Sequence, residues 1–105
     1  MFFQGLIDRR ASRGARRLDE VESGWPWSID PTKLKMWTLD QCVLGQLYGN
    51  YRLGLMKVDC DLDEDVSHGF APTFWGSIFL LYALRLARAW KREIRSRLAA
   101  AIPAA

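Results

Sequence analysis

The chain has 105 residues, half of them hydrophobic and five of them tryptophan, a composition that excludes an intrinsically disordered protein. This length predicts a single domain that can bury enough apolar surface to fold without a metal or a disulfide. The formal net charge is +3, from fifteen basic and twelve acidic residues. This excess is mild, so the distribution of the charges matters more than their sum.

Basic and acidic residues form separate blocks along the chain. Arginines gather in residues 9–17 and 85–97, whereas acidic residues gather in residues 59–65. The blocks either complement one another within the fold and face water, or the basic ones form a surface for nucleic acid or for an acidic partner.

Cysteine content and hydropathy indicate the compartment. The two cysteines, Cys42 and Cys60, are too few for the disulfide framework of a small secreted domain, and the first residues lack the apolar run of a signal peptide. Residues 74–84 carry no charge, but this segment is about half as long as the roughly 20 residues that span a bilayer. We therefore expect a cytoplasmic protein with reduced thiols and no membrane span.

The first predicted element is a short helix. Residues 1–12 are predicted to form a basic, poorly ordered leader, and residues 13–21 a helix with Leu18 on its apolar face. Gly24 suits the end of this helix, and Pro26 cannot extend it.

An aromatic segment follows. We expect Trp25, Trp27 and Trp37 to pack between helices, because aromatic side chains carry large apolar area. Asp30 and Pro31 predict the start of a short helix, with aspartate as the cap and proline in the first helical position.

A second main helix is predicted in the segment LDQCVLGQLYG. Thr38 or Asp40 would cap its start, and Gly49 and Asn50 would end it, because both tolerate the left-handed conformation. Its apolar face would include Leu39, Val43 and Leu47.

This segment also raises the question of a binding site, because it combines cysteine, glycine, glutamine and tyrosine. We interpret it as structural: Gly45 would allow close approach of the long final helix, and the Gln46 amide would bond to the backbone of residues 68–70. The residues assigned to this structural motif are Cys42, Leu44, Gly45, Gln46, Tyr48, Gly49, Tyr51 and His68.

The last and longest helix is predicted from Pro72 and Thr73 to about Ala100. Its continuous apolar stripe consists of Trp75, Phe79, Tyr82, Leu86, Trp90, Ile94 and Leu98. No segment alternates with a period of two, so we predict an all-α fold: a compact domain of three to four helices in residues 13–100, with a long C-terminal helix and a tail at residues 101–105.

The other side of the final helix changes character along its length. Its first turns are apolar nearly all round, which predicts that the helix starts inside the fold or inside an oligomer interface. Later turns carry a basic stripe that could contact phosphates, supported by arginines of the first helix. The candidate binding residues are Arg85, Arg88, Arg92, Arg95, Arg13, Arg16 and Arg17.

Motifs for catalysis or for a cofactor are not recognisable in the sequence. Cys42, Cys60 and His68 could supply three zinc ligands, but no two of them have the spacing of a structural zinc site. A small metal-stabilised domain is therefore the weakest of three alternatives, after a protein-binding module and a nucleic-acid-binding protein.

Short motifs occur in a fixed order between Leu18 and Ile94: L-D-E, G-W, I-D, C-x-L-G-Q-x-Y-G-x-Y, G-L, H-G-F and W-x-x-E-I. In this pattern the chain resembles a family of short proteins encoded by actinobacterial phages and prophages. Most members have no known function, and small phage proteins often act by binding. The resemblance thus implies a non-enzymatic accessory protein that contacts a host protein, a phage protein or a second copy of itself.

Overall fold

The computed structural model describes residues 2–61, 64–72 and 77–101. Four α-helices lie in these ranges: α1 (Phe2–Val21), α2 (Val43–Tyr48), α3 (Tyr51–Lys57) and α4 (Ser77–Ala101). Two 3-10 helices, η1 (Trp25–Ser28) and η2 (Pro31–Lys33), precede α2, and the described ranges contain no strand. The prediction of an all-α fold with a long C-terminal helix is confirmed.

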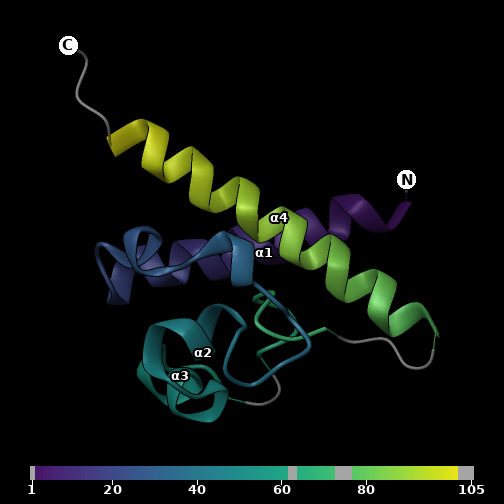
Figure 1. Ribbon diagram of the computed structural model, residues 1–105, viewed down its shortest axis with the longest axis horizontal. Coiled ribbons are helices and arrows are strands. Elements are labelled where there is room, and N and C mark those ends of the chain that lie inside the picture. Colours follow the sequence, from purple (N-terminus) through teal and green to yellow (C-terminus); the bar gives the residue numbers. More distant parts are fainter. Residues whose placement is uncertain (1, 62–63, 73–76, 102–105) are drawn as a thin grey trace.

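The two long helices, α1 and α4, cross each other, and the α2–α3 pair lies on one side of the crossing (Figure 1). The predicted stripe on α4 is confirmed where Tyr82, Leu86, Trp90 and Ile94 are buried, and Leu98 packs partly buried beside them. Trp75 lies outside the described residues. The facing stripe on α1 consists of Ile7, Ala11, Ala15 and Leu18, all fully buried.

Helix α1 begins at Phe2, well before residue 13, so most of the expected leader is helical instead. The physical reason is visible in its spacing: Ile7 and Ala11 lie four residues apart and continue the stripe that Leu18 completes. The charged side chains between them lie on the other faces of the same helix.

Two glycines let residues 64–70 pack onto the helix crossing. A Cβ atom on Gly14 would overlap the carbonyl oxygen of His68 and would lie 2.8 Å from the Trp90 ring. Gly69 has a φ of +69°, and a Cβ there would lie 2.8 Å from the backbone of α1 at Ala11. The Trp90 indole Nε1 donates a hydrogen bond of 2.7 Å to the Gly69 carbonyl. This close contact joins α1, α4 and the 64–70 segment.

The tryptophans do not all lie in the core. Trp25 is buried and meets Trp90 edge to face, with ring centroids 5.8 Å apart. Trp27 is 65% exposed and Trp37 41% exposed, so the prediction that all three pack between helices is wrong for these two. Because a 3-10 helix has about three residues per turn, Trp25 and Trp27 lie about 120° apart around η1 and cannot both face the core.

Helix α2 starts later than predicted. Its N-cap is Cys42, whose sulfur accepts a hydrogen bond of 3.3 Å from the Gly45 amide, rather than Thr38 or Asp40. Leu39 lies before the helix and is 57% exposed, so it is not part of the apolar face.

The predicted end of α2 is confirmed at Gly49, which has a φ of +85°, and the short helix at Pro31 is confirmed as well. Asn50 is not left-handed as predicted: its φ is −154°, and its side chain caps α3. Asp30 caps η2 by accepting a hydrogen bond of 3.0 Å from the Thr32 amide.

Candidate protein-interaction surface

The solvent-facing side of α4 carries two kinds of side chain in sequence. At about 100° per residue, the exposed leucines and arginines fall within a sector about 120° wide. We call this surface the outer α4 face; it consists of Leu80, Leu81, Leu84, Arg88, Arg92 and Arg95.

The apolar half of this face lies at the start of α4, at the edge of the molecule away from α2 and α3 (Figure 1). Leu80, Leu81 and Leu84 are 50%, 50% and 48% exposed. At these residues the helix therefore does not start inside the fold, and the alternative that it starts inside an oligomer interface stays a prediction. Because these three half-exposed leucines are neighbours on the helix, they form a contiguous apolar patch rather than isolated exposed residues.

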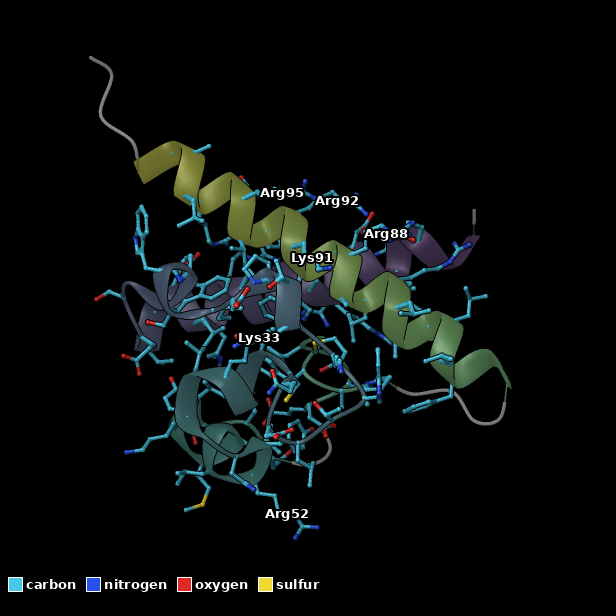
Figure 2. The ribbon with its side chains drawn as sticks, viewed as in Figure 1. Lys33, Arg52, Arg88, Lys91, Arg92 and Arg95 are labelled. Atoms are coloured by element: carbon cyan, nitrogen blue, oxygen red, sulfur yellow. The ribbon has the colours of Figure 1, made fainter. Side chains whose placement is uncertain are left out.

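The basic half follows within one turn. Figure 2 shows Arg88, Arg92 and Arg95 along the same edge of α4, with Lys91 close to them. Arg92 forms an ion pair of 3.2 Å with Asp8 of α1, and its side chain is still 51% exposed. The Arg95 guanidinium donates to the Lys91 carbonyl at 3.4 Å. An exposed pair of this kind contributes at most about 1 kcal/mol, so it leaves Arg92 available to a partner.

Arg85, the remaining α4 candidate, is half-buried and has an interaction of its own. It lies at the boundary of the outer α4 face rather than in its centre.

The α1 arginines do not join the α4 arginines in one surface. Arg13 donates a hydrogen bond of 3.0 Å to the Ser67 carbonyl, and Arg17 lies near Cys60, so both face the segment around residues 60–70. Asp8 and Asp19 lie on the other flank of α1 and meet the C-terminal half of α4. Arg16 is exposed between these flanks.

An arginine that the sequence pattern did not single out, Arg97, has a structural role. It pairs with Asp19 and with Glu93, both at 2.8 Å, and its guanidinium carbon lies 5.6 Å from the centre of the Trp25 ring. These hydrogen bonds hold the pKa of Asp19 below its ordinary value. The Glu93–Arg97 spacing of four residues is the sequence signal that could have identified half of this cluster.

The predicted motif residues of α2 make contacts within the fold, but two of these contacts differ from the predicted ones. A Cβ on Gly45 would lie 2.5 Å from the Leu39 carbonyl oxygen, so the close neighbour is the preceding turn and not the final helix. Gln46 accepts from the Asp30 amide at 2.7 Å and donates to the Asp30 carbonyl at 3.1 Å, so its partner is the start of η2 and not residues 68–70. Cys42 and Leu44 are buried.

The two tyrosines of this motif each bond to a carboxylate. Tyr48 donates to Glu22 at 3.0 Å, and burial together with this carboxylate raises the pKa of Tyr48 to about 12. Tyr51 donates to Asp65, and burial and that carboxylate raise the pKa of Tyr51 as well.

The zinc hypothesis is not supported. Within the part of the chain that the structure describes, no three histidine, cysteine or acidic residues lie close enough to hold a metal ion, and Cys42, Cys60 and His68 are all in that part. The His68 ring nitrogen Nδ1 is 3.0 Å from the Glu64 carbonyl, and the ring stacks on Phe70. Both cysteine thiols are buried, which raises their pKa.

The described helices include none that is long and apolar enough to cross a membrane. Comparison with known proteins finds no match to a protein-family model, to a curated protein or to a solved structure.

Proposed function

We propose that this protein is a small non-enzymatic accessory module that binds a partner protein through the outer α4 face. The observation that carries the proposal is the arrangement of three half-exposed leucines and three arginines along one side of one helix. A role as a phage or prophage accessory protein, binding a host or phage component, agrees with the resemblance of its sequence pattern.

The two halves of the face favour a partner of definite chemistry. Covering the exposed half of each leucine would contribute about 1 kcal/mol per side chain, at about 25 cal/mol per Å² of apolar surface. Arg88, Arg92 and Arg95 would contribute mainly to orientation and to the association rate. The partner surface that fits is an apolar patch continued by carboxylates.

A second copy of the chain fits this face poorly. The outer α4 face contains no acidic side chain, since Glu93 points to the opposite side of α4 toward Arg97. Two copies whose entire faces overlapped would place arginines opposite arginines or leucines, and like charges across an interface are unfavourable.

Nucleic acid remains the alternative partner, because Arg88 and Arg95 are about 10 Å apart along the helix and could contact phosphates. It leaves the leucine half unexplained. Phosphate contacts would also give binding that weakens steeply with salt and does not depend on the leucines.

Capture from actinobacterial lysate with matched variants tests the proposal. The apolar variant Leu80→Gln/Leu84→Gln and the charge variant Arg88→Glu/Arg95→Glu should each lose the captured protein. The control variants change similar exposed side chains on α3, which lies on the side of the molecule away from α4 (Figure 1): Met56→Gln, 77% exposed in the native chain, and Arg52→Glu. Both controls should retain it.

Three results would contradict the proposal. The first is equal capture by all four variants. The second is that nuclease treatment removes the captured material, and that the chain slows duplex or single-stranded nucleic-acid probes in a mobility-shift assay. In that case the charge variant alone would abolish the shift. The third is a homodimer in sedimentation analysis that Leu80→Gln/Leu84→Gln dissociates.

A further inference from the structure

A groove separate from the outer α4 face contains a carboxylate without a cationic partner. It has a volume of about 230 Å³ and lies between the turn at residues 36–39, the end of the 64–72 segment and Phe79 of α4. Its walls are mainly apolar and aromatic. The lining residues that bear on binding are Trp37, Tyr51, Asp65, Phe70 and Phe79.

Asp65 is the one buried charged side chain in the described part of the chain, at 7% exposure. One carboxylate oxygen accepts from the Tyr51 hydroxyl, and the other accepts from the Val66 amide at 2.7 Å. Asp65 takes part in none of the ion pairs among the described residues. The nearby Arg13 donates instead to the Ser67 carbonyl.

This arrangement leaves the carboxylate incompletely compensated. A carboxylate offers about four acceptor positions, of which Tyr51 and Val66 fill two. Removing an ionised carboxylate from water costs several kcal/mol unless it is paired as well as hydrogen-bonded. Tyr51 keeps its proton, because burial and the neighbouring carboxylate raise its pKa, so it supplies a hydrogen bond but no charge.

The aromatic walls narrow the class of cation that would complete the site. Trp37 and Phe79 are aromatic residues of the lining, and aromatic rings suit a weakly hydrated, planar cation, which a guanidinium is and an ammonium is not. The volume is below the roughly 300–1,000 Å³ of pockets that hold free ligands of drug size, and it suits a single side chain.

We propose that this groove binds an arginine side chain of a partner polypeptide, with the guanidinium on Asp65 and against Trp37. This site is separate from the outer α4 face, for which we propose an acidic partner surface. Failure of either proposal would leave the other untouched. Charge complementarity and the aromatic lining together identify the occupant.

The test uses the isolated full chain and a pair of small probes, N-acetyl-arginine amide and its neutral isostere N-acetyl-citrulline amide. Binding is followed by the indole and backbone signals in ¹H–¹⁵N NMR spectra. The arginine probe should shift the Trp37 indole and the amides around Asp65 and Tyr51 in a saturable way. The citrulline probe should bind at least tenfold more weakly.

Variants separate charge from structure. Asp65→Asn should lower affinity for the arginine probe at least tenfold, while Asp59→Asn, which removes the same charge from an exposed position nearby, should not. The backbone spectrum of each variant reports whether it is folded.

Equal binding of the arginine and citrulline probes would overturn the proposal, as would arginine-induced shifts confined to the outer α4 face. Should Asp65→Asn fail to fold, Trp37→Ala decides the question, because Trp37 is already 41% exposed. A folded Trp37→Ala protein that binds arginine as the native chain does would exclude this groove.

Discussion

Replacing Gly14 by alanine tests the contact that joins α1, α4 and the 64–70 segment. The added methyl group would lie 2.8 and 2.9 Å from Cζ2 and Cη2 of Trp90, and closer still to the His68 carbonyl oxygen, whereas ordinary contact starts at about 3.4 Å. The His68 carbonyl is backbone, so the whole segment must move. That movement strains the hydrogen bond from Trp90 to Gly69, 2.7 Å long in the native chain.

The magnitude follows from three opposing contributions. Overpacking of this kind costs about 1–3 kcal/mol. Weakening the Trp90 hydrogen bond adds about 1 kcal/mol, and alanine regains about 1 kcal/mol of helix propensity over glycine. We expect Gly14→Ala to lower the free energy of unfolding by about 2 kcal/mol.

Gly5→Ala is the matched control, because Gly5 lies in the same helix and is exposed, and a methyl group added there would lie 4.0 Å from the nearest atom it meets, in the Arg9 guanidinium. It should raise the free energy of unfolding by up to about 1 kcal/mol. Urea unfolding followed by far-UV circular dichroism measures both variants by linear extrapolation. Equal stability of the two variants would refute the close contact at Gly14.

Three further predictions concern burial and charge. Trp25→Ala should cost about 3–5 kcal/mol, because Trp25 is buried, whereas Trp27→Ala should change stability by about 0.5 kcal/mol or less; similar losses would contradict the described packing. Arg97 lowers the pKa of Asp19 in the folded protein. The Asp19 carboxylate therefore adds to the free energy of unfolding above the unfolded-state pKa of about 4, and this stabilisation is lost as pH falls through the folded-state pKa. Asp19→Asn should therefore flatten the acid side of the stability profile measured by urea unfolding, and an unchanged acid slope would count against it. Cys42 is buried, and burial also raises the pKa of its thiol, so a thiol reagent should label it only after the fold opens; rapid labelling without denaturant would show that the sulfur is accessible.

Features that depend on neighbours in the chain could be predicted from the sequence. The buried stripe through Tyr82, Leu86 and Trp90 follows from the helical period, and the stop at Gly49 follows from its tolerance of a positive φ. The start of α1 lies earlier than predicted because three charged residues separate Ile7 from Ala11, so the sequence has no continuous apolar run there. The spacing of four residues between these two was nevertheless present in the sequence.

The candidate site was predictable in part. The basic stripe on the final helix was identified by its spacing, and Arg88, Arg92 and Arg95 do lie along one edge of α4. That Leu80, Leu81 and Leu84 are not covered by the rest of the chain depends on where α1 and the α2–α3 pair lie. Asp65 could not be distinguished from its acidic neighbours, because its burial depends on Tyr51 and on the turn at residues 36–39.

By itself, the sequence determined that the chain is helical and that its last helix has one buried side. The reason is that the backbone hydrogen bonds of an α-helix join residues four apart, so the spacing of apolar residues within a short segment already shows the helical period. It also indicated that Gly45 and Gln46 needed close neighbours. Only the tertiary structure decided which partners they have. Gly14 meets His68 and Trp90, and Gln46 meets Asp30, because the crossing of α1 and α4 and the return of the 64–70 segment bring distant parts of the chain together.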